Sequence, residues 1–484
     1  MAYTLVDGVF RPLNHTPEGV LKEIKDNKYQ VILQFTDVPG RFHGPAVPYY
    51  SFSEKSFQEG FAALDTSSIE GFEYIFESDG VLLPDPRTFA VLPKEFCNHG
   101  KTARLICDVH SGYKKEQLPQ DPRYIAKRAA EAATNTGFDT VYVGPEAEFF
   151  ILDSVECDTI LPGRGVSYRI NSKEAPWSTG EGYTIPHKKG YYPLPNDTVM
   201  DFRSELSHML FESFNIPIEA HHHEVATGGQ SELDMKYDAL VNMADNIMTY
   251  KWAAKMLAKK HEKVVTFMPK PIFGDNGSGM HIHMSLWRDG ENTFYDPKDE
   301  YAELSETARR FIAGILKHAR SLSVFVNPTT NSYKRIVPGY EAPVFIAWSK
   351  GNRSAIVRVP VYHWGNPESK RVEFRSPDPS CNPYLAFAAI LAAGLDGIRL
   401  ELAPPAPVDR DIYELPPREL KKLGIGQLPG SIPEALLALE EDHEYLDGIF
   451  TEKAIERQIK YLEQSHKAVS IMPHPKEFEL YFDI

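Results

Sequence analysis

The sequence has few cysteines, no long apolar run and no excess of basic residues. Its four cysteines are scattered, without a Cys-x-x-Cys pair, so neither a disulfide framework nor a thiolate metal site is expected, and we predict packing roles for them. The longest apolar stretch, residues 384–395, is too short to span a bilayer. The net charge of −15 disfavours nucleic acid or an anionic membrane as a partner, because both attract basic surfaces.

The rest of the composition is ordinary for a globular protein. Hydrophobic residues make up 42% of the chain and charged residues 25%. The segment from Met1 to Asp7 lacks the basic start and apolar run of a signal peptide, which predicts a cytoplasmic protein. A length of 484 residues exceeds one ordinary core and predicts two domains.

Turn and capping signals indicate how the two domains are arranged. Short β-like runs alternate with turns up to about residue 115 and predict a small β-rich domain. Asp121 and Pro122 then predict the N-cap and first turn of a helix that runs toward Gly137 and opens the second domain. Residues 154–195 are rich in Gly, Pro, Ser and Lys and predict a long insertion or loop.

A glycine-rich turn followed by alternating polar residues is the most informative feature of the chain. The turn begins at Asn276 and Gly277, and the strand that follows places His281, His283 and Ser285 on one face. A glycine-rich loop lets a ligand approach backbone N–H groups. The combination predicts a place where a small anionic substrate meets a metal ion.

Two further segments show the same alternation. Glu146 and Glu148 share one face of a predicted strand, about 6–7 Å apart, where their charges repel unless a cation lies between them. Arg371, Glu373 and Arg375 also share a face. We expect this charged face to lie outside the apolar core, because burying charges without partners is costly.

More carboxylates accompany a cluster of histidines. The run from His221 to Glu224 ends in a glutamate, and Glu232 follows eight residues later. The candidate ligands are five carboxylates and at least one imidazole: Glu146, Glu148, Glu224, Glu232, Glu373 and His281. An oxygen-rich set with little nitrogen and no sulfur suits Mg²⁺ or Mn²⁺ better than Zn²⁺. Six ligands are enough for two ions.

Two hard cations beside a glycine-rich loop and several arginines are typical of sites that handle nucleotide phosphates. Each segment alone has an ordinary interpretation as a solvated sheet face, a group of core histidines or a surface ion-pair ladder. Four such segments in one chain favour a site. Phosphoryl transfer is therefore the leading prediction, and a two-metal hydrolase is an alternative that the arginines disfavour.

Eight stretches of the chain resemble class I glutamine synthetases and occur in that family's order. They are residues 65–72, 77–79, 144–150, 221–224, 267–281, 331–343, 352–354 and 371–378. The resemblance implies an α+β fold, with a small β-grasp-like domain over residues 1–115 and a large catalytic α/β domain with a curved antiparallel sheet over residues 116–484. It also implies a dodecamer of two hexameric rings, with active sites between neighbouring subunits.

The resemblance assigns a role to each matching position. One divalent ion would be held by Glu148, Glu224 and Glu232, and a second by Glu146, His281 and Glu373. The substrate-binding positions are Asn276, Gly277, Arg335, Glu341, Arg353 and Arg375. The nucleotide-binding positions are Glu219, Met235, Lys236, Tyr237, His283, Met284, Ser285, Arg353 and Arg358. Among the latter, Tyr237 offers an aromatic face to adenine.

The implied reaction has two steps. ATP phosphorylates the γ-carboxylate of L-glutamate, and ammonia then displaces phosphate to give L-glutamine. The implied catalytic residues are Asp65, Glu341 and Arg353. Asp65 would take a proton from ammonium in a neighbouring subunit's site. Glu341, a flap residue, would exclude water and accept a proton. Without the resemblance, Asp65 would be interpreted as a turn aspartate and Glu341 as a solvated loop residue.

Some positions depart from the family pattern. Thr66 replaces a usual glycine, and Phe72 occupies a position that some members fill with tryptophan, so the ammonium pocket is expected to differ slightly. Tyr74 stands where alpha-type enzymes carry an arginine for feedback inhibition, and the insertion before Tyr191 looks like the beta type. Tyr413 matches a tyrosine that is adenylylated in some bacterial relatives, although an exposed loop tyrosine is an equal interpretation.

Two other functions stay open within the resemblance. A γ-glutamyl-amine ligase would use a polyamine in place of ammonia, but the retained Asp65 and Glu341 disfavour it because a bulky amine needs a wider pocket. A non-catalytic structural relative would have lost metal ligands and arginines, whereas all six ligand positions are filled here.

Overall fold

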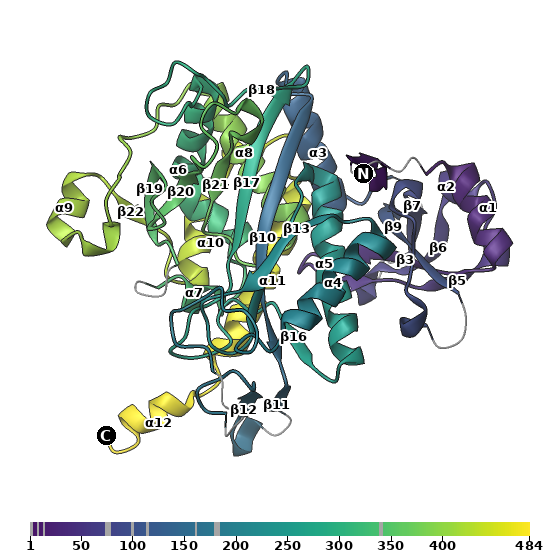
Figure 1. Ribbon diagram of the computed structural model, residues 1–484, viewed down its shortest axis with the longest axis horizontal. Helices are drawn as coiled ribbons and strands as arrows, with labels where there is room; N and C mark the ends of the chain where they lie inside the picture. Colours follow the sequence, from purple (N-terminus) through teal and green to yellow (C-terminus); the bar gives the residue numbers. More distant parts are fainter. Residues whose placement is uncertain are drawn as a thin grey trace.

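The computed structural model describes residues 3–6, 9–12, 15–72, 79–97, 101–112, 116–159, 162–178, 184–337 and 342–484. Two main sheets organise these residues, a smaller one in the N-terminal part and a larger curved one in the rest of the chain (Figure 1). Helices pack beside both sheets. The predicted α+β class is therefore confirmed.

The N-terminal sheet runs in the order β4-β3-β9-β7-β6, with β5 paired to β3 and β8 to β9. Its strands are β3 (Gln30–Thr36), β4 (Phe42–His43), β5 (Ala46–Pro48), β6 (Phe61–Asp65), β7 (Asp79–Pro84), β8 (Ala90–Val91) and β9 (Thr102–Ser111). Helices α1 (Pro17–Asn27) and α2 (Ser56–Glu59) accompany them, and β1 (Tyr3–Val6) pairs with β2 (Val9–Pro12) as a separate hairpin. Val31, Leu33 and Phe35 of β3 are buried, as period-two alternation requires.

The larger sheet runs in the order β13-β14-β10-β17-β21-β20-β19-β22, and β15, β16 and β18 pair with its central strands. The strands are β10 (Thr140–Leu152), β13 (Ile218–His223), β14 (Gln230–Met235), β15 (Asp238–Ala239), β16 (Val264–Thr266), β17 (Met280–Arg288), β18 (Glu291–Asn292), β19 (Phe345–Lys350), β20 (Ala355–Val359), β21 (Val372–Phe374) and β22 (Gly426–Gln427). Neighbouring strands are antiparallel except for β19 and β20. The central strands β10 and β17 therefore carry polar residues from distant parts of the chain side by side.

Long helices cover the outer face of this sheet. The helices of this part are α3 (Pro122–Asn135), α4 (Met200–Phe214), α5 (Leu240–Lys260), α6 (Glu306–Val326), α7 (Ser332–Arg335), α8 (Pro383–Arg399), α9 (Pro417–Lys422), α10 (Ile432–Glu441), α11 (Glu452–Ser470) and α12 (Pro475–Tyr481). Asp121 caps α3 by accepting a hydrogen bond from Arg123 N–H, as the sequence predicts.

The longest apolar stretch of the chain forms the buried helix α8. Its residues from Pro383 to Gly397 are all buried, and it crosses α6 so closely that a Cβ on Gly314 would lie 2.0 Å from the Ala393 carbonyl oxygen. Glycine is therefore required at that crossing. No helix in the described ranges is long and apolar enough to cross a membrane.

A buried ionic cluster joins the two main sheets. The guanidinium of Arg123 on α3 donates to Asp85 at 2.8 Å, to Asp108 at 2.8 Å and to Asp245 at 3.0 and 2.9 Å. Asp85 and Asp108 belong to the N-terminal sheet region, whereas Asp245 lies on α5. Arg123 therefore bridges three carboxylates at the boundary between the two parts. Arg87 also pairs with Asp85, and Lys127 also pairs with Asp108.

Replacing Arg123 with methionine is expected to lower the free energy of unfolding by about 3–5 kcal/mol, because buried Asp245 loses its salt bridge and Asp85 and Asp108 each lose one of two cationic partners. Urea denaturation followed by circular dichroism measures the change. Arg128→Met is the matched control, since this half-buried arginine lies on the same helix but contacts the Gly448 carbonyl oxygen and the Tyr124 ring in place of carboxylates. Equal stability of the two variants would contradict the role of Arg123 as the cation that bridges these aspartates.

The structure corrects three sequence expectations. Part of the predicted loop between residues 154 and 195 is a hairpin of β11 (Ser154–Asp158) and β12 (Ser167–Asn171), because alternating β-forming residues outweigh the turn-rich composition there. Cys157 on this hairpin is exposed, so its predicted packing role is wrong, while Cys107 and Cys381 are buried. Of the charged face, Glu373 and Arg375 are buried and Arg371 is half-buried, and Arg358 and Arg375 both pair with Glu373.

Candidate active site

The register of the central strands brings the predicted ligands together. Glu148 of β10 lies opposite Glu232 of β14, Glu146 lies opposite His281 of β17, and His283 of β17 lies opposite Glu373 of β21. Opposite residues of an antiparallel pair project from the same face. All these side chains except Glu373 line one cavity of 780 Å³, a size typical of small-molecule sites.

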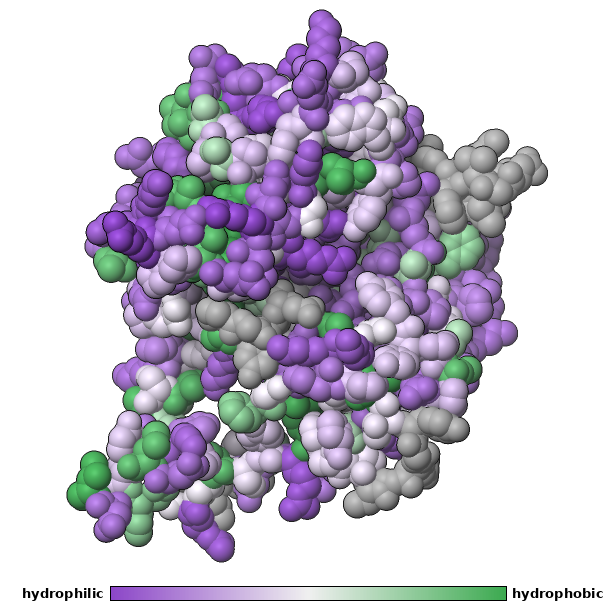
Figure 2. All heavy atoms as spheres, turned by 60° about the vertical axis from the view of Figure 1, so that its left-hand side comes forward, coloured by the Kyte–Doolittle hydropathy of each residue, from purple (hydrophilic) through white to green (hydrophobic). Residues whose placement is uncertain are grey.

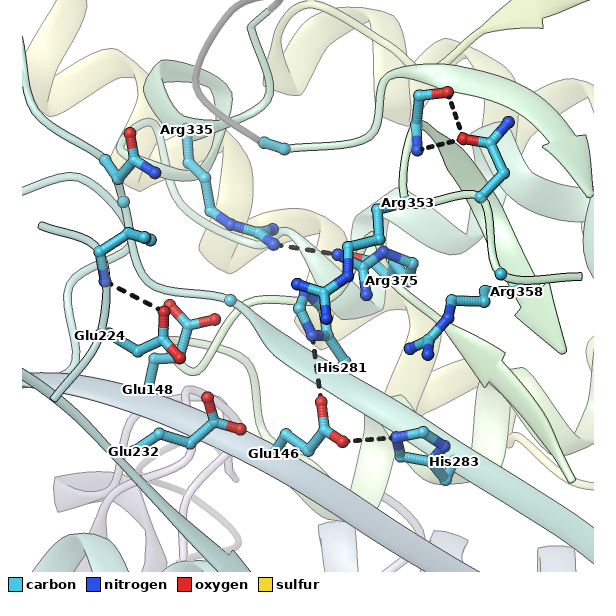
Figure 3. A pocket seen from close by; sticks show the side chains of 18 of the residues that line it. Glu146, Glu148, Glu224, Glu232, His281, His283, Arg335, Arg353, Arg358 and Arg375 are labelled. Carbon is cyan, nitrogen blue, oxygen red and sulfur yellow. Dashed lines mark hydrogen bonds and ion pairs between the residues drawn. The ribbon is translucent and has the colours of Figure 1, made fainter. Parts of the chain in front are cut away.

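One acidic group lies at the β13 and β14 side of the cavity. Ligand atoms of His222, Glu224 and Glu232 lie within 4.8 Å of one another, and Figure 3 shows the carboxylates of Glu148 and Glu224 close together beside Glu232. Burial and then the negative charge of Glu224 raise the pKa values of Glu148 and Glu232 well above the usual range. Gln230 Nε2 donates to Glu148 at 2.7 Å but brings no charge. The group is thus repulsive without a cation.

A second group lies where β10, β17 and β21 meet. Ligand atoms of Glu146, His283 and Glu373 lie within 4.8 Å of one another. His281 Nδ1 lies 3.3 Å from Glu146 Oε2 and 3.9 Å from Glu373 Oε1. Burial alone would raise the pKa of Glu373, but the positive charges of Arg375, His283 and His281 together outweigh burial and lower this pKa to about 2. Glu373 is therefore ionised at all working pH values.

The donor atoms of both groups fit divalent metal ions. Carboxylate oxygens with one or two imidazole nitrogens suit Mg²⁺ or Mn²⁺. In the first group, burial and the charge of Glu224 raise the pKa values of Glu148 and Glu232, and a bound cation would oppose both effects. The tight groups also contain His222 and His283, which the predicted ligand sets omit. Their positions two residues from Glu224 and from His281 were the available signal.

Arginines face these carboxylates from the other side of the cavity (Figure 3). Arg358 Nη1 donates to Glu373 Oε2 at 2.6 Å, and Arg375 Nη1 donates to Oε1 at 2.5 Å. The Nε atoms of Arg358 and Arg375 are buried and find no acceptor among the described residues. Arg353 enters the same space. Buried donors without acceptors favour an anionic ligand here.

Residues predicted to hold the amino acid lie at the end of the cavity near the first acidic group. Asn276, Gly277 and Arg335 all line it. A Cβ on Gly277 would lie 2.2 Å from the Pro269 carbonyl oxygen, so glycine lets this turn pack closely. Arg335 Nη1 donates to the Ser376 carbonyl oxygen at 2.8 Å, which fixes its guanidinium beside the turn.

A smaller pocket of 430 Å³ adjoins the main cavity and shares Glu146 and His283 with it. Six predicted nucleotide-binding residues line it: Glu219, Met235, Tyr237, His283, Met284 and Ser285. Lys236 lines neither space. The ring of Tyr142 packs edge-on against Tyr237 and Trp287, with centroids 5.2 and 5.4 Å away. Sequence reasoning missed Tyr142 and Trp287. The pocket therefore offers aromatic edges and faces to a planar ligand.

Two predicted catalytic residues are not in the cavity that the structure describes. Asp65 ends strand β6, is exposed, and accepts hydrogen bonds from Ser67 and Ser68; it does not line the cavity. Glu341 and Tyr74 lie outside the described residues. Tyr413 lines the cavity and donates to the Ala342 carbonyl oxygen at 2.7 Å. It is therefore half-buried and not a freely exposed loop tyrosine.

The first acidic group predicts how metal-free stability depends on pH. Because Glu148 and Glu232 have raised pKa values in the folded state, the folded protein binds more protons than the unfolded chain above the ordinary value of 4.5. Their contribution to the free energy of unfolding therefore falls as pH rises from about 4.5 toward neutrality. Urea denaturation in chelator measures it, and Glu148→Gln should flatten the slope. A slope equal to wild type in that variant would contradict the assignment.

Comparisons with known proteins agree with this geometry. Residues 27–112 match the glutamine synthetase beta-grasp domain, and residues 119–481 match the glutamine synthetase catalytic domain. The glutamine synthetase of Sulfolobus acidocaldarius is 48% identical, over 96% of this chain and 98% of its own length. That of Aquifex aeolicus is also 48% identical, over 97% of this chain and 99% of its own.

Solved structures give the same result. A Plasmodium falciparum glutamine synthetase shares the fold with a TM-score of 0.87 and 28% identity, over 97% of this chain and 99% of that one. A structure titled as a GmaS/ADP complex has a TM-score of 0.79 and 28% identity, over 96% of this chain and 99% of that one. The expected β-grasp and catalytic folds are confirmed, and the chain belongs to the glutamine synthetase family.

Proposed function

We propose that this chain is a glutamate–ammonia ligase, which joins ammonia to L-glutamate with ATP to give L-glutamine, ADP and phosphate. Family membership and full-length relatives named glutamine synthetase support this reaction. The observation that carries it is one cavity in which buried carboxylates face converging arginines, beside a separate aromatic pocket. A nucleotide and a small amino acid can occupy such a pair of spaces together.

The divalent ions would bind where the carboxylates gather. Glu148, Glu224 and Glu232 would hold one ion, and Glu146, His281 and Glu373 the other, with Mg²⁺ or Mn²⁺ as the metal. Bound ions would supply positive charge that offsets both the carboxylates and the phosphates of ATP. His222 and His283 lie close enough to take part.

The remaining residues would bind and orient the substrates. Tyr237 would stack on the adenine in the smaller pocket, and the phosphates would extend into the larger cavity toward Arg353 and Arg358. Arg353 and Arg375 would neutralise charge that develops on the transferred phosphoryl group. Glu219, Met235, Lys236, His283, Met284 and Ser285 would complete the nucleotide contacts.

The amino acid would bind with its γ-carboxylate toward the phosphates and its α-groups toward Asn276, Gly277 and Arg335. Phosphorylation turns the γ-carboxylate into an acyl phosphate, which has a good leaving group. Ammonium is not nucleophilic until it loses a proton, and Asp65 would accept that proton. Glu341 would close the site, because water competes with ammonia for the acyl phosphate.

Completion of the site would require a second copy of the chain. Asp65 lies on the N-terminal sheet and does not line the cavity of its own subunit, so we place it in a neighbour's site within a dodecamer of two hexameric rings. The domains would divide at residues 115 and 116, next to residues outside the described ranges. A cytoplasmic location stays a prediction from the sequence.

The C-terminal helix is consistent with assembly. α12 projects away from the body (Figure 1), and Figure 2 shows hydrophobic side chains on the projection at its lower left. Phe478, Leu480, Tyr481 and Phe482 are all at least half exposed. An apolar patch of this kind is typical of a surface that another chain covers.

Assays of glutamine formation test the proposed function. Glutamine should form from ATP, glutamate and ammonium with Mg²⁺ or Mn²⁺, and far less product should form when putrescine or ethanolamine replaces ammonium. The relatives do not favour the amine-ligase alternative. Preferential use of a bulky amine, or no ATP turnover with any acceptor, would overturn the proposal.

A further inference from the structure

Tyr362 occupies the border between the two spaces of the candidate site. It follows β20, and its exposed fraction is 67%, which is high for a large aromatic residue. Tyr362 lines the larger cavity, and the next residue, His363, lines the smaller pocket. Core packing does not hold an exposed ring at this border. The hydrogen bonds of the Tyr362 hydroxyl group therefore determine the role of this residue.

The hydroxyl of Tyr362 fixes one end of Arg358. Arg358 Nη2 donates to Tyr362 Oη at 2.6 Å, and the guanidinium carbon lies 5.3 Å from the ring centre. The other terminal nitrogen, Nη1, donates to Glu373 Oε2 at 2.6 Å. The planar guanidinium is thus held at both tips, and its orientation toward the cavity is determined.

The same phenol also contacts Arg353. Burial is the largest influence on Arg353 and opposes its charged form, but its interactions with Tyr362, Tyr191 and Glu373 together outweigh burial, so the pKa of Arg353 lies above its usual value. Figure 3 shows the side chains of Arg353 and Arg358 entering the cavity from the same side. Two guanidinium groups repel each other. The Tyr362 oxygen accepts from Arg358 and also interacts with Arg353, which offsets this repulsion.

We propose that Tyr362 is a positioning residue for the phosphates of the nucleotide: its hydroxyl holds Arg353 and Arg358 side by side, ready to bind the phosphate chain. Phosphate oxygens bind best to guanidinium groups that are already oriented, and a pre-ordered pair loses less conformational entropy when the ligand binds. The inference rests on the proposed function for the identity of the nucleotide as ATP.

Steady-state kinetics of Tyr362→Phe test the role of the hydroxyl, since this variant keeps the ring. The KM for ATP should rise about 10-fold, because the lost hydrogen bond joins charged groups. The turnover number should fall less than about 3-fold, and the KM for glutamate should not change. Trp364→Phe is the matched control, because Trp364 lies on the same loop, is 58% exposed and lines neither space. It should behave as wild type.

Calorimetric binding separates this inference from the proposed reaction. With Mg²⁺ present, Tyr362→Phe should bind the non-hydrolysable analogue AMPPNP about 10-fold more weakly than wild type, but bind adenosine equally well. Unchanged AMPPNP binding, or equal weakening toward adenosine, would overturn the positioning role. If the wild type binds AMPPNP and makes no glutamine, the proposed function fails. The comparison of Tyr362→Phe with wild type would still test the positioning of the arginines for phosphate binding.

Discussion

Glu232→Gln is expected to abolish glutamine formation and, at the same time, to stabilise the metal-free protein. The substitution keeps the size of the side chain and removes one of the buried negative charges that face Glu148 and Glu224. Loss of a metal-binding carboxylate should lower kcat/KM by about a thousandfold or more, since such an ion contributes several kcal/mol to the transition state.

The stability effect has the opposite sign because the charges repel each other. Burial and the charge of Glu224 hold the pKa of Glu232 well above the usual range, so its ionised form costs free energy in the folded state. The glutamine variant should therefore melt at a higher temperature than wild type at neutral pH in chelator, and should gain less stability from added Mn²⁺.

Scanning calorimetry with and without Mn²⁺ measures both changes. Glu440→Gln is a matched control, because Glu440 is an exposed glutamate on α10, far along the chain from the acidic group. It should leave activity and melting temperature unchanged. An active Glu232→Gln enzyme, or one whose metal-free form is less stable than wild type, would contradict the ion-binding role.

Co-expression of two inactive variants is expected to restore activity. Asp65→Ala removes the proposed proton acceptor and should cost about 10²- to 10⁴-fold in turnover, while Glu232→Gln removes a metal ligand. If Asp65 acts in a neighbour's site, a mixed ring contains sites with an intact Asp65 from one chain and an intact Glu232 from the other. Random assembly should give about a quarter of wild-type activity.

A second pair of variants is the control for this experiment. Arg353→Gln and Glu232→Gln both alter the cavity of a chain's own subunit, so every site formed by co-expression carries a defect and the intact fraction is zero. This pair should stay inactive. Purified Asp65→Ala should still bind AMPPNP. Failure of the first pair to exceed the sum of its members would place Asp65 in its own subunit's site or outside catalysis.

Alternation along single strands could be predicted from the sequence. It correctly placed His281 and His283 on one face, and Glu146 and Glu148 on another strand's face, because side chains of a strand alternate with a period of two. The N-cap of α3 at Asp121 could also be predicted, because it depends on neighbouring residues in the sequence. The resemblance to the family supplied the rest of the fold, including the β-grasp domain that the comparisons confirm.

Contacts between distant strands could not be predicted in this way. The register that sets Glu148 opposite Glu232 depends on the pairing of whole strands, which no local pattern encodes. The same holds for the Arg123 cluster, whose three aspartates lie far apart in sequence. His222 and Tyr362 were missed because a histidine or an exposed tyrosine is common, and only their neighbours in space give them meaning.

The fate of one oxygen atom tests the central claim most directly. If the converging arginines and carboxylates transfer the γ-phosphoryl group to glutamate, glutamate labelled with ¹⁸O in its γ-carboxylate should pass one labelled oxygen to inorganic phosphate for every glutamine formed. Mass spectrometry of the released phosphate measures this transfer. Phosphate without the label, whose fourth oxygen comes from water while glutamate keeps both labelled oxygens, would contradict the account.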